Sequence, residues 1–388
     1  MKKSFGFLTL FFCATLASSS FAKEKEWALL LFLNANNNLA TFGDLNLNQI
    51  ESIGSTDDVD VIVQWGRTGQ DKTYRMKMMK DDDMKKITSP YVETLPRVDM
   101  GDYKNLIEFV RWSHEHYPAK RYFIAFWNHG SGWYRGPADP NRGVSYDDYS
   151  GNHITTEQMG TAMREIAKII GHKVDIVGAD ACLMAMGEVA SEMQDSVDVY
   201  VASEETEPGV GWPYHMWLNR WVKNSKATPA EVATYLVEEY FESLKEKNGI
   251  TLSAMDLTRL PAVWERMKEL GQHISLLKTS DMTPVHEAIE SAISFYSADA
   301  TDLGHAMTKA KGAKSLVDEK LLMSVQEKVK DLIIANKTSP GYANATGISV
   351  WYPKYKSVYE RHLNAYQSLR FAKETGWDKV LSTNFSQP

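Results

Sequence analysis

Five apolar runs stand out before residue 205, and each ends in polar or small residues. They read "WALLLFLN", "VDVIVQWG", "RYFIAFWN", "VDIVGADA" and "VDVYVASE", and start at Trp27, Val59, Arg121, Val174 and Val197. Such runs are typical of strands buried on both faces. Amphipathic segments separate most of them, and this alternation predicts an α/β fold with a mostly parallel sheet sandwiched by helices.

Helix and turn signals fill the intervals between the runs. "TTEQMGTAMREIAKIIG" predicts a helix with a Thr cap that ends at Gly171. "VSYDDYSGNHIT" predicts a hairpin, and the alternating "KTYRMKMMK" predicts an exposed hairpin arm. After the fourth run, "LMAMGEVASEM" predicts a helix that begins at Cys182.

The chain changes character beyond Ser225. Thr228, Pro229 and Glu231 form a strong helix start, "GITLSAMDL" predicts a strand, and residues 258–336 look mainly helical. A late strand, "ATGISVWYP", could join the sheet. We therefore predict an α/β core over residues 23–225 and a largely helical carboxyl-terminal extension over 226–388.

The first 22 residues look like a secretory signal peptide. Lys2 and Lys3 precede an apolar stretch, and a small-x-small ending falls at Ser20 and Ala22. We expect a secreted or periplasmic protein. The apolar stretch is short for a membrane span, and no later run reaches 18 apolar residues, so no membrane association is expected after signal removal.

Composition narrows the classes of protein further. Hydrophobic residues make up 43% of the chain, including 11 Trp and 18 Tyr, which excludes global disorder. The formal net charge of -7 argues against nucleic acid as a partner. The chain has two cysteines, Cys13 in the predicted signal and Cys182, so the exported protein would keep a single thiol that cannot form an internal disulfide. We expect a monomer.

Cys182 and His129 follow two of the predicted strands directly. Ligands of parallel sheets bind at the carboxyl ends of strands, so both side chains are expected in one crevice. A thiol and an imidazole together supply a nucleophile and a proton shuttle. A helix beginning at Cys182 would stabilise its thiolate, and the backbone amides of Gly130 and Cys182 could face a developing oxyanion. The alternative is a buried structural cysteine beside a structural histidine.

The blocks "NHGSGW" and "DACLMA" resemble the clostripain family of cysteine peptidases, which are relatives of caspases, gingipains and legumain. The similarity extends through "WALLLFLNANNNL", "VASEETEPGVGWPY" and "LRFAKETGWDKVL". It implies a caspase-like fold, with His129 as the catalytic histidine and Cys182 as the nucleophile. It also implies that Asp180, two positions earlier, lines the pocket for an Arg or Lys before the scissile bond. Otherwise Asp180 would merely cap the expected helix.

The chain departs from the family pattern at two places, and the second of them concerns this pocket. The first-strand loop reads "NANNN" where members often carry an acidic residue, and Val210 stands between glycines where many have an acidic or polar residue. Glu205 and Glu207 lie nearby and could bind substrate in compensation. The alternative for both glutamates is a solvent-exposed position.

Family members are commonly zymogens cut between the two blocks. Arg142 and Arg135 each precede a glycine in the intervening loop, so self-cleavage after Arg142, or else Arg135, is a hypothesis. No organic cofactor and no metal site is expected. Calcium remains possible because some members depend on it, although Asp139 and Asp147 lie in no complete calcium-loop signature.

The sequence thus predicts an exported endopeptidase that cleaves peptides or proteins after Arg or Lys through a thioester. Three alternatives stay open. A transpeptidase of the same fold would use the same residues, but would join its product to an added amine. A silent surface-binding protein would lack reactivity toward a thiol-directed peptide. An exported nucleotide-dependent enzyme would require saturable nucleotide binding, and no dinucleotide or Walker fingerprint is present.

Overall fold

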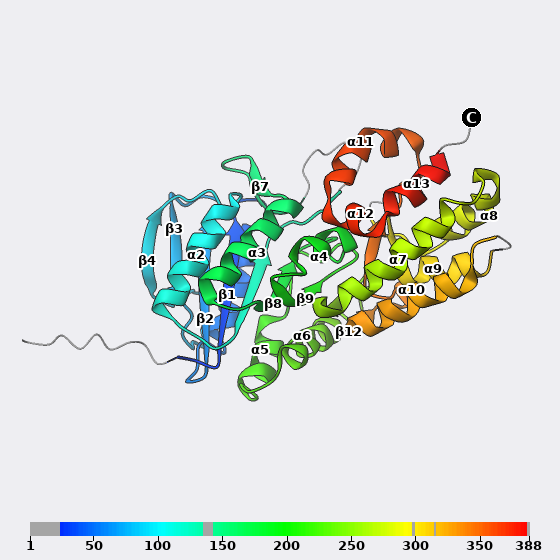
Figure 1. The fold of residues 1–388 in the computed structure, drawn as a ribbon. Coiled ribbons are helices and arrows are strands. Elements are labelled where there is room, and N and C mark those ends of the chain that lie inside the picture. Colours follow the sequence, from blue (N-terminus) through cyan, green and yellow to red (C-terminus); the bar gives the residue numbers. More distant parts are fainter. Residues whose placement is uncertain (1–23, 135–142, 297–298, 314–315, 386–388) are drawn as a thin grey trace, which may run out of the picture.

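One sheet organises the molecule, which we describe from a computed structural model covering residues 24–134, 143–296, 299–313 and 316–385 (Figure 1). Within these residues nine strands follow the order β12-β10-β9-β8-β5-β1-β2-β3-β4. The centre, from β9 to β2, is parallel, and two antiparallel strands extend each edge. The predicted sheet is confirmed. Its strands are β1 (Trp27–Ala35), β2 (Val59–Arg67), β3 (Lys72–Lys77), β4 (Tyr91–Pro96), β5 (Tyr122–Trp127), β8 (Val174–Asp180), β9 (Val197–Ala202), β10 (Thr251–Asp256) and β12 (Ile333–Thr338).

Helices cover both faces of this sheet, which explains its uninterrupted apolar runs. Along β1, Leu29, Leu31 and Leu33 belong to one core cluster, whereas Leu30 and Phe32 belong to the other. Because successive side chains alternate between faces, a strand covered on both sides must be apolar throughout. The cluster of Leu30 and Phe32 includes residues of α2 (Tyr103–His116), α3 (Thr156–Ile170) and α4 (Gly187–Met193). The cluster of Leu29, Leu31 and Leu33 includes residues of α1 (Ala40–Glu51), α5 (Tyr214–Val222) and α6 (Pro229–Ser243).

The predicted helix starts of α3 and α6 are confirmed in detail. Thr155 and Thr228 each cap a helix and form a capping box, with Gln158 and Glu231 as the respective partners. Gly171 ends α3 with a left-handed backbone, at φ 82°. Each cap satisfies backbone N–H groups that would otherwise lack a partner, a contribution of about 1 kcal/mol.

Residues 72–77 do not form the exposed arm that their alternation predicts. They are strand β3 of the main sheet, between β2 and β4, and Met76 is buried. The polar face is also covered, because the Arg75 guanidinium stacks on the Trp112 ring of α2 and bonds to Gln64. Alternation identified the strand, but covering of its polar face by a helix depends on tertiary packing.

The chain beyond residue 225 contributes strands as well as helices. β10 and β12 join the main sheet, although residues 333–336 fall in the segment expected to be mainly helical. The late strand, β13 (Ser349–Trp351), instead pairs with β11 (Ala300–Asp302) in a separate small sheet, and β6 (Val144–Asp147) and β7 (Asn152–Ile154) form the expected hairpin. The division at residue 225 stays a prediction. The remaining helices are η1 (Leu257–Arg259), α7 (Leu260–Ile274), α8 (Thr279–Glu290), α9 (Leu303–Lys311), α10 (Glu319–Leu332), η2 (Pro340–Tyr342), α11 (Lys356–Ser368), α12 (Arg370–Thr375) and α13 (Trp377–Phe385).

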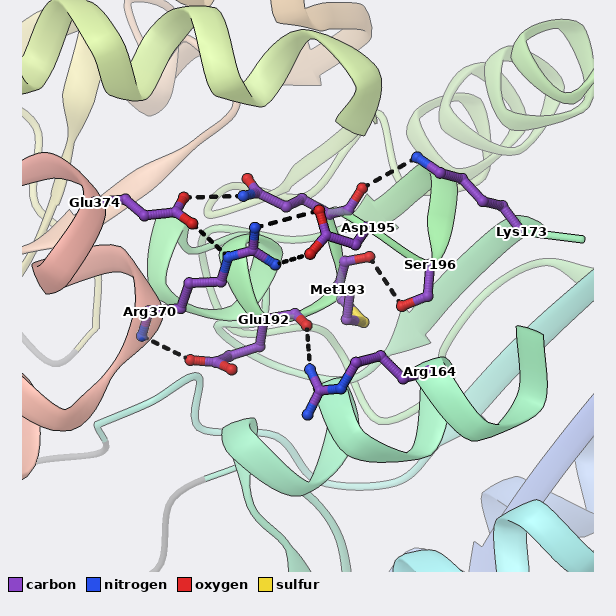
Figure 2. Close-up of polar contacts among 9 residues, drawn as sticks. Arg164, Lys173, Glu192, Met193, Asp195, Ser196, Arg370 and Glu374 are labelled. Carbon is purple, nitrogen blue, oxygen red and sulfur yellow. Dashed lines mark hydrogen bonds and ion pairs between the residues drawn. The ribbon is translucent and has the colours of Figure 1, made fainter. Parts of the chain in front are cut away.

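An ion-pair cluster fastens the carboxyl-terminal helices to the core (Figure 2). Arg370, the first residue of α12, donates its backbone N–H to Glu192 of α4 at 2.9 Å. Its guanidinium binds Glu374 at 2.6 Å and both carboxylate oxygens of Asp195. Bidentate pairing of this kind fixes orientation as well as position. The cluster therefore ties α12 to the end of α4.

In the described part of the chain, no helix combines the length and apolar composition that a bilayer span requires. The predicted signal peptide, residues 1–22, lies outside the described residues.

Candidate active site

Four neighbouring strands deliver their carboxyl ends to one edge of the sheet. β9, β8, β5 and β1 are adjacent and parallel. The pairing of β5 with β8 places Trp127 opposite Asp180, so the loops that follow these two strands leave the sheet side by side. The expected neighbourhood of the two strands is confirmed.

A cavity of about 190 Å³ opens at this edge. His129, Asp180, Cys182 and Glu207 all line it. The structure therefore brings together the predicted nucleophile, the predicted histidine and two of the three predicted substrate-binding acids. The other lining residues are Leu39, Trp127, Asn128, Ala181, Pro208, Gly209 and Gly211.

Cys182 is half-buried and lines the cavity. Its Sγ accepts a hydrogen bond from the backbone N–H of Glu207 at 3.3 Å, which holds the sulfur at the cavity wall. The expected helix does not begin here, because α4 starts only at Gly187. Cys182 consequently lies outside the first turn of that helix, and the helix dipole does not account for a thiolate at this position.

The irregular segment between Cys182 and α4 has a physical reason. Leu183 donates its N–H to the Glu205 carbonyl at 3.1 Å, and Ala185 donates to Ser203 at 2.9 Å. These bonds compete with a helical turn, and Leu183 adopts a left-handed backbone, at φ 62°. That conformation costs a residue with a Cβ about 1–2 kcal/mol. The helical periodicity of the sequence gave no sign of this pairing.

His129 is oriented by a residue that the sequence reasoning did not select. Its Nε2 lies 2.7 Å from Oδ1 of Asn38, which can accept a hydrogen bond from a protonated Nε2. Asn38 belongs to the "NANNN" loop directly after β1, so the strand-end argument applied to Cys182 and His129 would have found it. Asn128 steadies the same region by donating to the Asn34 carbonyl at 2.6 Å and accepting from Tyr146 N–H at 2.7 Å.

Gly130 allows the histidine loop to touch the cysteine loop. A Cβ at this position would lie 2.5 Å from the Cys182 carbonyl oxygen and 2.9 Å from the Cβ of Ala181. The nearer atom belongs to the backbone, so it cannot move aside as a flexible side chain would. The close approach of the two loops therefore requires glycine.

Asp180 and Glu207 form a buried carboxyl pair in the cavity. Asp180 accepts hydrogen bonds at one oxygen from Trp212 N–H at 3.1 Å and from the Tyr214 hydroxyl at 3.0 Å. Both side-chain oxygens of Glu207 are buried, and no Lys or Arg occurs among the described residues that line this cavity. Gly211 completes the wall, because a Cβ there would lie 2.8 Å from both Asp180 oxygens.

The electrostatics of this pair follow from burial without a cation. Desolvation raises the pKa of Asp180 to about 6, against the lowering effect of hydrogen bonds from Trp212, Tyr214 and Glu207. Burial and the negative charge of Asp180 raise the pKa of Glu207 well above its usual range. Two adjacent carboxyl groups in such a site retain a proton between them near neutral pH. The pair can lose that proton when a positive charge arrives.

Glu205 and Val210 lie apart from this cavity. Glu205 is buried, not solvent-exposed, and lines a second cavity on the other side of the segment that carries Glu207. Val210 is 39% exposed, and its neighbours Gly209 and Gly211 line the first cavity in its place. Of the two compensating acids considered, the structure places only Glu207 beside Asp180.

Three of the remaining predicted residues lie outside the described residues, namely Arg135, Arg142 and Asp139. Asp147 is buried and accepts N–H bonds from Asn36, Met100, Tyr149 and Ser150. No group of three or more His, Cys, Asp or Glu side chains suited to a metal occurs within the described ranges.

Comparison with known proteins identifies a family. A model of the clostripain family matches residues 31–383. Clostripain of Hathewaya histolytica is 32% identical over 142 residues, which cover 34% of this chain and 27% of that protein. The chain thus spans about a quarter of the length of the curated relative it matches.

Two solved structures share the fold. A secreted C11 cysteine protease from Bacteroides thetaiotaomicron, in complex with an irreversible peptide inhibitor, is 19% identical with a TM-score of 0.70, covering 91% of this chain and 100% of that one. An inactive zymogen C11 protease from Parabacteroides distasonis is 17% identical with a TM-score of 0.72, covering 91% and 99%. At these identities the likeness shows the fold alone.

The contact at Gly130 yields a stability prediction. Gly130→Ala would force the two loops apart, and we expect the free energy of unfolding to fall by about 1–3 kcal/mol, as for other overpacking substitutions. Urea denaturation measures it. Gly341→Ala is the matched control, since a Cβ there meets nothing within 4 Å. Equal stability of the two variants would contradict the requirement for glycine.

Proposed function

This chain belongs to the clostripain family, and from that membership we propose that it is an exported cysteine endopeptidase that cleaves after Arg or Lys. The family model covers most of the chain, which confirms the resemblance found in the sequence. The caspase-like fold implied by that resemblance is likewise confirmed. Specificity and catalytic roles are inferred from this chain's sequence and geometry, and self-activation is inferred from its sequence and relatives.

The observation that carries the proposed specificity is the buried carboxyl pair. Asp180 and Glu207 line the same cavity as Cys182 and His129, and no Lys or Arg occurs among the described residues of its lining. Ionising a buried carboxyl pair that lacks a cation is costly, and a cationic side chain would reduce that cost. An Arg or Lys before the scissile bond supplies such a cation, with several donors for charge-assisted hydrogen bonds.

The proposed reaction is acyl transfer to the thiol. The Cys182 thiol gives its proton to His129, and the sulfur forms a bond to the substrate carbonyl carbon. His129 then protonates the leaving amine as the C–N bond breaks, which leaves a thioester. Water attacks the thioester, releases the acid product and restores the thiol. The backbone N–H groups of Gly130 and Cys182 are the proposed oxyanion donors.

Substrate charge also favours the nucleophile. The Asp180–Glu207 pair carries a negative charge once Asp180 is ionised, and negative charge near the sulfur disfavours the thiolate. A basic side chain that pairs with the acids neutralises this repulsion. The thiolate would therefore form most readily with the correct substrate in place, which links selection of the side chain to activation of the nucleophile.

Export and self-activation complete the proposal. The sequence of residues 1–22 and the secreted relative support export. A zymogen among the structural neighbours supports a zymogen form of this chain. We propose that it is activated by self-cleavage after Arg142, or else Arg135, between His129 and Cys182 in the sequence. Mass spectrometry would find a cut chain in the wild-type protein and an intact chain in Cys182→Ala. A cut chain in both would exclude self-cleavage.

The central experiment compares fluorogenic peptides with Arg, Lys, citrulline, Asn or Asp before the scissile bond. We expect cleavage after Arg and Lys, none in Cys182→Ala or His129→Ala, and a loss of kcat/KM on the order of 10²-fold in Asp180→Asn and Glu207→Gln. Exposed Glu246→Gln serves as the control. Equal cleavage after Asn or Asp would refute the pocket, and transfer to an added amine in place of hydrolysis would indicate a transpeptidase.

Asn38 is proposed to position the imidazole. Asn38→Ala would remove the hydrogen bond to Nε2, so we expect kcat to fall roughly tenfold to a hundredfold with little change in KM. Asn38→Asp keeps an acceptor but adds a negative charge, which should raise the pKa of His129 and shift the acidic limb of the pH–rate profile upward. Exposed Asn224→Ala is the control. An unshifted profile in Asn38→Asp would argue against the contact.

The pH dependence of substrate selectivity tests the titration of Asp180 in the carboxyl pair. As pH rises through about 6, Asp180 loses its proton and the pocket gains negative charge. The ratio of kcat/KM for Arg over neutral citrulline should therefore rise, by about tenfold per pH unit below the midpoint. Taking the ratio cancels the titration of His129 and Cys182. Asp180→Asn should flatten it, and a flat ratio in the wild-type protein would exclude the mechanism.

A further inference from the structure

A second cavity of about 510 Å³ adjoins the candidate active site. Glu207 and Pro208 line both cavities, so the segment that carries them forms a shared wall. The other walls come from the carboxyl-terminal part of the chain, including Phe295, Tyr296 and Tyr342. A peptide bound over Cys182 would therefore have a neighbouring side chain within reach of the second cavity.

The chemistry of the second cavity is acidic and aromatic. Glu205 is 5% exposed, and its carboxylate accepts hydrogen bonds from Thr206 N–H at 2.7 Å, Tyr296 N–H at 3.1 Å and the Tyr342 hydroxyl at 2.5 Å. These neutral donors leave its charge uncompensated. No Lys, Arg or His occurs among the described residues that line the cavity. A negative field in a partly enclosed site favours a cation.

Aromatic rings supply the second recognition element. The Tyr342 and Phe295 rings lie with centroids 5.3 Å apart, and Tyr296 is 72% exposed beside them. The faces of such rings attract ammonium and guanidinium groups. A carboxylate beside aromatic rings fits a basic side chain. An acidic side chain would be repelled by Glu205 and Glu207.

We propose that this cavity is a second subsite of the peptidase, which binds another Lys or Arg of the same substrate within two residues of the one held by Asp180 and Glu207. The inference rests on the proposed function and extends it. Substrates with two closely spaced basic residues are therefore the preferred class. The carboxyl-terminal part of the chain contributes directly to this selection.

The test uses a set of peptides with Arg before the scissile bond. Each position within two residues of that Arg carries, in turn, Lys, Arg, norleucine, Phe or Glu. We expect one position at which Lys or Arg raises kcat/KM roughly tenfold over norleucine. Tyr296→Ala should reduce this preference to within about twofold, Tyr296→Phe should keep it, and Glu205→Gln should reduce it. Tyr355→Ala, which removes a ring that is 69% exposed elsewhere, should leave it unchanged.

Two readouts keep this test separate from the proposed function. Cleavage of the singly basic norleucine peptide tests the activity itself. Binding of doubly and singly basic peptides to Cys182→Ala, measured by fluorescence polarisation, tests the subsite without turnover. No preference at any second position, a preference for Phe, or a preference that Tyr296→Ala leaves intact would overturn the proposal.

Discussion

The register between β5 and β8 is the constraint on which the candidate active site depends. It sets Trp127 opposite Asp180, and the chain then needs only two further residues on each strand to bring His129 and Cys182 to one cavity. Side chains alternate faces along a strand, so a slip of one residue would turn Asp180 away from the pocket. The apolar runs on both sides of the sheet fix this register, because slippage would exchange the residues of the two core clusters.

The second requirement is close contact between loops. Gly130 lets the histidine loop lie against the Cys182 carbonyl. Gly211 lets its own segment of the cavity wall lie against the Asp180 carboxylate. The Cys182 thiol is held by a backbone N–H of Glu207, and the turn after it is held by Glu205 and Ser203. Backbone hydrogen bonds therefore position the thiol, in place of the helix that the sequence predicted to begin at Cys182. The cost of the left-handed Leu183 is offset by these bonds.

Uncompensated acids give the site its character. Glu207 is buried beside Asp180, Glu205 accepts hydrogen bonds from neutral donors, and no Lys or Arg occurs among the described residues that line either cavity. Such groups reduce the stability of the empty protein. They are useful when a substrate supplies the missing positive charge, since binding then recovers free energy that folding gave up. Both cavities share this arrangement, and one shared wall connects them.

The sequence by itself determined the parallel sheet, the capped helices and the meeting of His129 with Cys182, because periodicity and strand-end position are local properties of the chain. The same argument would have found Asn38. Tertiary structure alone decided that β3 lies inside the sheet, that Cys182 precedes the helix by a turn, and that Glu207, not Glu205, lies beside Asp180. Each of these depends on contacts between segments far apart in the chain, for which local patterns carry no signal.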